Sequence, residues 1–299
     1  MDAVIRLEGL TKYYGKERGV VDLDLEVGPG EVFGYLGPNG AGKTTTIRLL
    51  IDLLRPTRGR AEVLGRDPCT EGRAVRREIG YLPGELTLWE KLTGRQLLTF
   101  LAHIWEMEDP GPAEATAERL DLDLTRPIRD LSRGNKQKLG LVQALMHSPR
   151  LLVLDEPTSG LDPLVQRQFY ALAREAREEG RTVFLSSHVL SEVERIADRV
   201  GIIRDGRLVV VESLEALKAK ALRRVEIHFA GAVPREEFAA LPNVGDVAVD
   251  DGVLSCTIVG SVDPLIKAAA RHEVTNLLTH EADLEELFLR YYEGVGDAA

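Results

Sequence analysis

The stretch that decides how this chain folds runs from position 37 to position 45 and reads Gly37-Pro38-Asn39-Gly40-Ala41-Gly42-Lys43-Thr44-Thr45. It matches the phosphate-binding pattern G-x-x-x-x-G-K-[ST], whose glycines let successive backbone N–H groups turn inward around a phosphate. Lys43 can reach the β- and γ-phosphates of a nucleotide, and the Thr44 hydroxyl can hold Mg²⁺. A short apolar strand over residues 31–36 leads into the loop, and an apolar helix from Thr44 to roughly Leu54 leaves it. Strand, loop and helix in this order predict a P-loop with the helix dipole directed at the phosphates.

The composition is that of a globular chain large enough for two domains. It has 299 residues, 44% of them hydrophobic and 29% charged, and a formal net charge of −10. An acidic balance argues against a primary nucleic-acid partner, because a phosphate backbone requires a basic face. The two cysteines, Cys69 and Cys256, lie far apart and indicate neither a disulfide framework nor a Cys/His metal site, which fits a reducing compartment. We expect neither a signal peptide nor a membrane-spanning run, so any membrane role would require a partner chain.

The segment before the P-loop has the alternation of a half-exposed sheet. Residues 4–7 and 20–27 alternate apolar and polar side chains, which predicts an antiparallel β-layer. Tyr14 stands just before a glycine between these strands. Its ring could stack on a nucleobase or could simply be half-buried at a strand end, and the residue alone favours neither.

Two acidic residues at the end of a buried strand form a second chemical centre. Four apolar residues at 151–154 are followed by Asp155 and Glu156. Ligands of open α/β sheets bind at the carboxyl ends of strands, so Asp155 can hold Mg²⁺ and Glu156 can polarise the water that attacks the γ-phosphate. A further apolar strand at 182–187 ends at His188, which we expect to donate to the γ-phosphate.

A helix-rich region separates these two centres. Residues 92–131 carry helical signals broken by proline, and an apolar helical spacing runs from Lys136 to His147. Ser132 and Gly134 therefore lie at a helix start, where an N-cap and an anion-binding site are both possible. We interpret the region as a helical subdomain inserted in the α/β core.

The last third of the chain has a different pattern. Asp205-Gly206 between two apolar runs predicts a β-hairpin. Strands at 225–229, 244–249, 253–259 and 274–279 alternate with helices at 234–241 and 262–271 in the order β-α-β-β-α-β, which predicts a small ferredoxin-like module. A closing helix is predicted from the apolar spacing of Leu284, Leu287, Phe288 and Tyr291. No chemical constellation is visible there, so a docking or regulatory role is the default.

Taken together, these motifs resemble the ATP-binding subunit of an ABC transporter over about residues 3–215. The resemblance rests on the P-loop, the signature Leu131-Ser132-Arg133-Gly134-Asn135, the Walker B strand ending in Asp155 and Glu156, the D-loop Ser159-Gly160-Leu161-Asp162, and the switch histidine His188. It implies ATP and Mg²⁺ as cofactors and places Tyr14 against adenine. It implies that Ser132, Gly134 and Asp162 complete the nucleotide site, and that Lys43, Glu156 and His188 act in hydrolysis.

The chain departs from the family pattern at two places. Arg133 and Asn135 replace the usual second glycine and glutamine of the signature, which resembles the drug and antibiotic exporter branch with a separate permease chain. The glutamine of the Q-loop is also absent, because Gly84 occupies its position with Glu85 beside it. Either Glu85 substitutes for it or the γ-phosphate is linked to the permease differently.

The resemblance implies an α/β P-loop NTPase core of the ABC type with an antiparallel β-layer and an inserted helical subdomain. We expect an ATP-binding domain over 1–220, its helical subdomain at about 86–148, a C-terminal α+β domain over 223–293 and a tail over 294–299. The implied mechanism is a dimer, with a second ATP-binding subunit of the same chain, in which ATP on one P-loop is covered by the signature helix of the other subunit. The implied location is the cytoplasmic face of a membrane, bound to the permease.

Residues 85–99 are the expected docking surface for the permease. Leu86, Leu88 and Trp89 would be its exposed apolar residues, or would instead be buried inside the helical subdomain. A non-transport ABC ATPase acting on nucleic acid or ribosomes is the alternative function, and an importer ATPase is a third. Neither a long coiled coil nor a second cassette, which mark non-transport relatives, is present in the sequence. The cargo is chosen by the permease and is not encoded here.

Overall fold

The computed structural model describes residues 2–107, 111–220, 222–279 and 288. Its contacts divide the chain into two units, Met1–Glu212 and Ser213–Ala299, which are described separately below. The domain limits at 220 and 223 expected from the sequence stay a prediction. None of the helices in the described part of the chain combines the length and the apolar run needed to span a bilayer.

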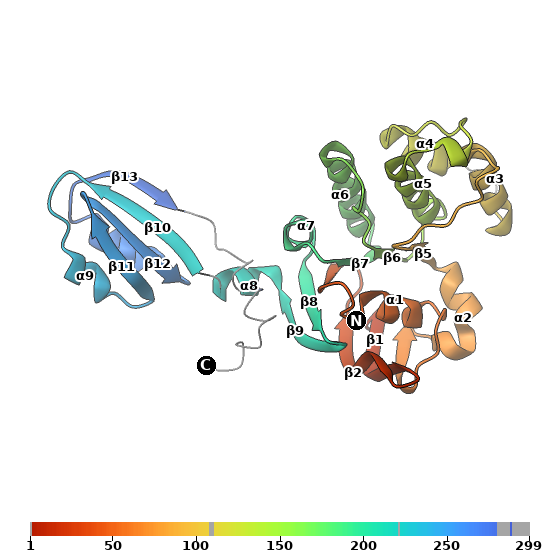
Figure 1. The fold of residues 1–299 in the computed structure, drawn as a ribbon, viewed down its shortest axis with the longest axis horizontal. Helices are drawn as coiled ribbons and strands as arrows, with labels where there is room; N and C mark the ends of the chain where they lie inside the picture. The colour runs from red at the N-terminus through yellow and green to blue at the C-terminus, as the bar shows by residue number, and fades with distance from the viewer. Residues whose placement is uncertain (1, 108–110, 221, 280–287, 289–299) are drawn as a thin grey trace. The chain divides into compact units, whose positions relative to one another are not determined.

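A six-stranded sheet forms the centre of the first unit (Figure 1). Its strands lie in the order β5 (Ile79–Leu82), β6 (Leu151–Asp155), β7 (Thr182–Ser187), β3 (Val32–Leu36), β8 (Arg199–Arg204) and β9 (Arg207–Ser213). The first five strands in this order, from β5 through β3 to β8, pair in parallel. Every residue of β6, β7 and β3 is buried, as continuous apolar runs in a covered parallel sheet require. The predicted hairpin is confirmed, because Asp205 and Gly206 both adopt the left-handed conformation between β8 and β9.

The predicted antiparallel β-layer is also present. Its strands lie in the order β2 (Glu17–Val27), β1 (Ile5–Tyr14) and β4 (Arg58–Val63). In β2 the side chains from Val21 to Val27 alternate between buried and exposed. The buried face packs with helix α1 (Lys43–Leu50) and with the central sheet in one apolar core.

Helix α1 is shorter than the sequence predicts, ending at Leu50 instead of near Leu54. Asp52 adopts a left-handed conformation with φ of 56°, and the backbone N–H of Leu53 donates to Arg48 O at 2.9 Å. A left-handed residue just past the last turn closes a helix by satisfying its terminal carbonyls. The apolar run 51–54 therefore continues as a turn.

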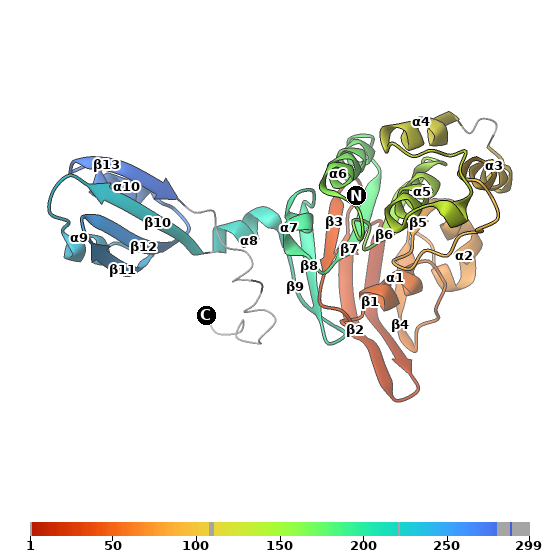
Figure 2. The ribbon, with the colours of Figure 1, turned by 45° about the horizontal axis from the view of Figure 1, so that its top comes forward.

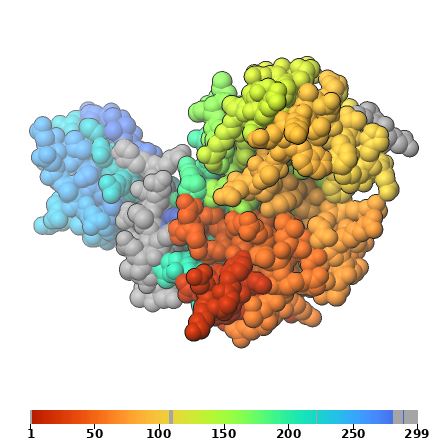
Figure 3. Space-filling view, turned by 45° about the vertical axis from the view of Figure 1, so that its right-hand side comes forward, coloured from red at the N-terminus to blue at the C-terminus, as the bar shows by residue number. Residues whose placement is uncertain are grey.

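The helical part of the first unit contains α3 (Gly94–Ile104), α4 (Gly111–Arg119), a 3₁₀ turn (Ile128–Asp130) and α5 (Arg133–Leu145). Helix α5 begins at Arg133, one turn before the apolar spacing indicates, because the Ser132 hydroxyl caps it by accepting from Asn135 N. The other helices of this unit are α2 (Pro68–Arg77), α6 (Pro163–Glu178) and α7 (Leu190–Glu194). Figure 3 shows the yellow and green atoms of the helical part in contact with the red and orange atoms of the core.

The second unit starts with α8 (Leu214–Lys220) and has the predicted β-α-β-β-α-β order. Its elements are β10 (Leu222–Phe229), α9 (Arg235–Ala239), β11 (Val244–Asp250), β12 (Val253–Val259), α10 (Asp263–Ala269) and β13 (Val274–Thr279). The strands pair antiparallel in the order β11-β12-β10-β13, which confirms the ferredoxin-like prediction. Phe229, Phe238 and Leu265 belong to its separate core. Apart from Phe288, the predicted closing helix lies outside the described residues.

Candidate active site

Three strand ends bring the predicted site residues to one edge of the central sheet. Strands β6, β7 and β3 are neighbours (Figure 2), and their register pairs Asp155 with Ser186 and Leu36 with Ser187. Gly37 N, the first amide of the P-loop, donates to Ser187 O at 3.2 Å. The P-loop, the acidic pair and the residue after β7 therefore meet at the carboxyl edge, where open α/β sheets bind ligands.

The P-loop itself requires glycine at two positions. Gly42 has φ of 109°, and a Cβ there would lie 2.7 Å from Val20 Cγ1. A Cβ at Gly37 would lie 2.5 Å from Ile203 O. Helix α1 starts directly after Gly42 with no side-chain cap and no acidic residue in its first turn. Its first N–H groups and its positive dipole end are thus available to an anion.

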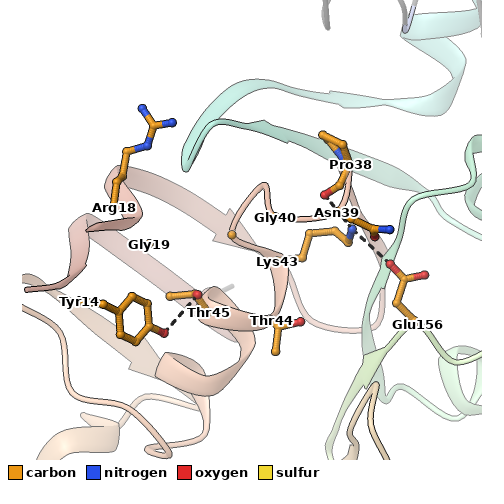
Figure 4. A pocket seen from close by; sticks show the side chains of 11 residues that line it. Tyr14, Arg18, Gly19, Pro38, Asn39, Gly40, Lys43, Thr44, Thr45 and Glu156 are labelled. Atoms are coloured by element: carbon orange, nitrogen blue, oxygen red, sulfur yellow. Dashed lines mark hydrogen bonds and ion pairs between the residues drawn. The ribbon is translucent and has the colours of Figure 1, made fainter. Parts of the chain in front are cut away.

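A pocket of about 240 Å³ lies over the loop (Figure 4). Its lining contains most of the predicted nucleotide-binding residues together with two that were not predicted: Tyr14, Arg18, Gly19, Pro38, Asn39, Gly40, Gly42, Lys43, Thr44, Thr45 and Glu156. Tyr14 is 42% exposed, and its hydroxyl lies 3.3 Å from Thr45 Oγ1. Lys12 Nζ lies 5.7 Å from the centre of the same ring. An exposed aromatic face at the pocket lining can stack on a nucleobase.

Lys43 is 6% exposed and contacts three acceptors. Its ammonium group donates to Gly37 O at 2.6 Å and to Pro38 O at 3.2 Å, and it lies 3.2 Å from Glu156 Oε1. The contact with Glu156 is an ion pair without the alignment of a hydrogen bond. The carboxylate of Glu156 thus neutralises a buried cation that a phosphate would otherwise neutralise.

Asp155 is almost fully buried, and hydroxyl groups hold its carboxylate. Thr44 Oγ1 donates to Asp155 Oδ2 at 2.8 Å, and Ser186 Oγ donates to Asp155 Oδ1 at 2.5 Å. A buried carboxylate beside a P-loop hydroxyl is an oxygen donor set that suits Mg²⁺, which binds one or two carboxylates together with substrate phosphates and water. The described residues hold no group of three or more His, Cys, Asp or Glu side chains that could by itself bind a metal ion, and Mg²⁺ at a P-loop does not require one.

Glu156 is held in an uncommon conformation beside His188. Its φ is 50°, in the left-handed region that non-glycine residues rarely adopt. Its backbone N–H is held by Ser186, with O at 3.2 Å and Oγ at 3.1 Å. His188 Nδ1 lies 2.8 Å from Glu156 Oε2 and carries the proton there, since a carboxylate only accepts. Backbone strain of this kind concentrates at functional sites, which fits the predicted role of Glu156.

Several predicted residues do not line this pocket. Gly37 and Ala41 shape the loop from behind, and Ala41 is 3% exposed. Ser132 caps α5, and Asp162 caps α6 by accepting from Leu164 N at 3.0 Å and Val165 N at 3.1 Å.

Sequence reasoning missed Arg18, Gly19 and Ser186. The first two line the pocket because the β1–β2 hairpin lies beside the P-loop, and no local pattern in the sequence marks them. Ser186 bridges Asp155 and the Glu156 amide. Its signal was available, since Ser186-Ser187-His188 is a polar run at the end of a buried strand.

Gly84 lies next to the carboxylate of Asp155, two residues after the end of β5. A Cβ at Gly84 would lie 3.3 Å from Asp155 Oδ2. Leu86 and Leu88 are half-buried, while Trp89 is 53% exposed. Of the three residues, Trp89 fits the exposed docking position, whereas Leu86 and Leu88 lie closer to the alternative of burial inside the helical subdomain.

Comparison with known proteins agrees with this geometry. The family described as ABC transporter matches residues 20–159. The bacitracin transport ATP-binding protein BcrA of Enterococcus faecalis is 32% identical over 305 residues, which cover 100% of this chain and 99% of BcrA. The chain belongs to the ABC transporter family. A fluoroquinolones export ATP-binding protein of Mycobacterium tuberculosis is 35% identical over 96% of this chain and 92% of its own length.

Solved ABC cassettes share the fold. The structure of an ATP-binding subunit of an ABC transporter is 29% identical and has a TM-score of 0.65, covering 72% of this chain and 92% of its own. A dimeric ATP-binding cassette in a post-hydrolysis state, bound to ADP and Pi, has a TM-score of 0.64 at 23% identity, covering 70% of this chain and 98% of its own, and supports the fold alone. The predicted ABC ATPase core is confirmed, and as an ATP-binding subunit of this family the chain is an ATPase.

Proposed function

We propose that this chain hydrolyses ATP to power the export of a drug, antibiotic or lipid-like cargo through a separate membrane permease. The observation that carries the proposal is the pocket over the P-loop, where Glu156 lies together with Lys43 and Thr44 of the loop. Relatives named for bacitracin transport, daunorubicin resistance and fluoroquinolone export support export as the purpose of this ATPase. They give no support to the alternative of an ATPase acting on nucleic acid or ribosomes.

The chemistry of hydrolysis follows from the contacts of the pocket. Lys43 and the P-loop amides bind the β- and γ-phosphates, and Tyr14 stacks on the base. Thr44 and Asp155 would hold Mg²⁺, which neutralises charge on the phosphates when bound. Binding of phosphate to Lys43 releases Glu156 from its ion pair. Glu156 can then accept a proton from the attacking water, while His188 orients its carboxylate.

A second copy of the chain completes the site in this proposal. Ser132, Gly134 and Asp162 lie outside the pocket of their own subunit. Ser132 and Gly134 stand at the N-terminus of the 13-residue helix α5, where N–H groups and the helix dipole favour a phosphate. ATP bound on one P-loop would be covered by this helix end from the partner subunit, so that nucleotide closes the dimer.

Three exposed apolar side chains form the proposed permease-docking surface. Trp89, Phe100 and Ile104 are 53%, 45% and 54% exposed, and the rings of Trp89 and Phe100 meet edge to face at 4.9 Å. Phe100 and Ile104 lie one turn apart on α3, so both face the same side. Clustered exposed aromatic and aliphatic side chains are typical of protein interfaces.

The chain itself links this surface to the catalytic centre, because it runs from β5 past Asp155 to Trp89. Ile79 and Tyr81 of this strand line a cavity of about 330 Å³ together with Trp105 and His147. Burial raises the pKa of Tyr81 to about 12, and the charge of Asp155 contributes in the same direction. Beyond β5 the chain passes Gly84 beside Asp155. In the absence of a Q-loop glutamine, we propose that the backbone of this segment transmits motion between the permease and the nucleotide.

The test is to purify the tagged chain from its native membrane in mild detergent and to identify what accompanies it. We expect a polytopic membrane protein in stoichiometric amount, which would also place the chain at the membrane. Trp89→Glu should lose that partner while ATPase activity stays within about twofold, because a charge in a docking surface opposes burial. Ile266→Glu, at a 48% exposed apolar residue of the second unit, is the matched control and should retain the partner.

Two results would contradict the proposal. Soluble factors or RNA in place of a membrane protein would exclude export. Equal recovery of the membrane partner with Trp89→Glu and with wild type would leave export standing but would remove this docking surface.

A further inference from the structure

The segment that follows the Walker B strand is attached to the signature helix by a buried glutamine. Gln137 is 6% exposed and lies on α5. Its Nε2 donates to Pro157 O at 3.2 Å and to Glu156 O at 3.4 Å. Helix α5 therefore holds the backbone of the residue that we propose as the catalytic base.

A second attachment lies one helical turn earlier, at Arg133. Its Nη2 donates to Ser159 Oγ at 3.3 Å. Gly160 has φ of 76°, and a Cβ there would lie 3.5 Å from Arg133 Nε and 3.6 Å from its Cδ. The arginine side chain thus lies along the turn at van der Waals distance, and positions 133 and 137 face the same side of the helix. The segment 156–160 is held to α5 at both ends.

The start of α5 and this turn also approach each other through their backbones. A Cβ at Gly134 would lie 3.0 Å from Gly160 O. This is tighter than an ordinary side-chain contact, so the glycine allows the turn to lie directly against the helix start. A displacement of the turn therefore reaches Gly134 and Ser132 without an intervening flexible side chain.

We propose that Arg133 is a positioning residue that couples the two ATP sites of the dimer, an inference that rests on the proposed function. Glu156 acts on the ATP of its own subunit, whereas Ser132 and Gly134 act on the ATP of the partner. Arg133 and Gln137 join these two groups inside one subunit. A shift of Glu156 during hydrolysis at one site is thereby passed to the helix end that covers the other site.

The contact of Arg133 can be removed without endangering the fold. Arg133 is exposed and Ser159 is only half-buried, so neither loses its access to water when the other is truncated. Truncation of either residue should weaken the response of one ATP site to the other and should leave nucleotide binding unchanged.

The experiment measures ATPase rate against ATP concentration for the full chain. We expect Arg133→Ala and Ser159→Ala each to bring the Hill coefficient close to 1, from a value between 1 and 2, and to lower turnover about 3- to 10-fold. The half-saturating ATP concentration should change less than about twofold. The double variant should be no worse than either single one, since both remove the same contact. Arg133→Lys should restore part of the cooperativity because it keeps a donor.

The matched control is Arg129→Ala, an exposed arginine of the preceding 3₁₀ turn that contacts Asp130, and it should change neither quantity. The proposal would be overturned if the losses of turnover caused by Arg133→Ala and Ser159→Ala multiplied in the double variant. A tenfold change in half-saturation with unchanged cooperativity would also overturn it, since it would mean that Arg133 binds the nucleotide directly. A wild-type Hill coefficient of 1 would overturn it as well.

A second measurement does not depend on the dimer. In the full chain without ATP, Arg133→Ala should speed amide hydrogen exchange over residues 158–161 at least fivefold, because the turn loses an attachment. Unchanged exchange would overturn the proposed contact. Failure of the proposed function would look different: Glu156→Gln would stay monomeric with saturating ATP while the exchange result still reported on Arg133.

Discussion

At the scale of single residues, the site depends on a few contacts between groups far apart in the sequence. Lys43 and His188 hold the two oxygens of the Glu156 carboxylate at 3.2 Å and 2.8 Å. Asp155 is held by the hydroxyls of Thr44 and Ser186. The contacts from His188 and Ser186 orient the two carboxylates before nucleotide arrives, whereas the Lys43 ion pair must open when phosphate binds.

Replacement of Glu156 tests its role as the base. Glu156→Gln keeps the shape and the contact distance but cannot accept a proton, so hydrolysis should slow by about 10²-fold or more. Binding of a fluorescent ATP analogue should change little, because Lys43 and the P-loop amides are intact. Glu178→Gln, at the end of α6, is the matched control. Wild-type turnover in Glu156→Gln would show that another group is the base.

Replacement of Tyr14 tests recognition of the base. Stacking on an aromatic side chain contributes about 1–3 kcal/mol per base, so Tyr14→Ala should raise the KM for ATP about tenfold with turnover nearly unchanged. Tyr14→Trp should retain affinity. Tyr13→Ala is a close control, since Tyr13 is similarly exposed at 39% on the same strand but does not line the pocket. Equal effects at both positions would point to loss of the strand end instead of loss of stacking.

At the scale of elements, the contact between α5 and the segment after α3 joins the helical part to the core. Trp105 follows α3, and its ring stacks on His147, just beyond α5, with centroids 4.0 Å apart and planes 7° apart. His147 Nε2 donates to Ile79 O of β5 at 3.2 Å, and its Nδ1 is buried with no hydrogen-bond partner. A proton on Nδ1 would therefore place an uncompensated charge between these elements.

The stability of this contact should depend on pH. Burial lowers the pKa of His147, and its hydrogen bond to Ile79 opposes this only in part. Between the lowered value and about 6.5, the ordinary value for histidine, the unfolded chain binds more protons than the folded one. The free energy of unfolding contributed by this group is therefore complete above about pH 6.5 and falls as the pH drops below it.

Urea denaturation followed by tryptophan fluorescence at about pH 7.5 and about pH 5.5 measures this effect. His147→Phe keeps a stacking ring without a titrating group, so its midpoint should fall less between the two values than that of wild type. His103→Phe, at an exposed histidine of α3, is the control. An equal fall in wild type and His147→Phe would exclude His147 as the cause.

At the scale of the whole molecule, the ATP site and the ferredoxin-like unit have separate cores. Every residue that lines the nucleotide pocket lies within Met1–Glu212, and the buried cluster of Phe229, Phe238 and Leu265 lies within the other unit. The sequence predicts no catalytic or ligand-binding cluster in the second unit, and a docking or regulatory role for that unit stays a prediction.

Truncation separates the two units. A chain that ends at Lys220 should bind ATP with an affinity within about twofold of the full chain, because it keeps the whole pocket and the core around it. Isothermal titration with ATP measures this, with Glu156→Gln in both chains to prevent turnover. Loss of binding in a soluble truncated chain would show that the second unit supports the ATP site.

The P-loop, the acidic strand end, the Asp205-Gly206 hairpin and the order of elements in the second unit can all be predicted from the amino-acid sequence. These depend on local chemistry, such as glycine at left-handed positions and the period of apolar residues, which a short window of sequence carries. Four features became visible in the folded chain alone: Arg18 lines the pocket, Ser186 bridges Asp155 and Glu156, Arg133 contacts Ser159, and helix α1 ends at Leu50. Most of these depend on which strands and turns become neighbours across long stretches of chain, and no local pattern encodes that choice.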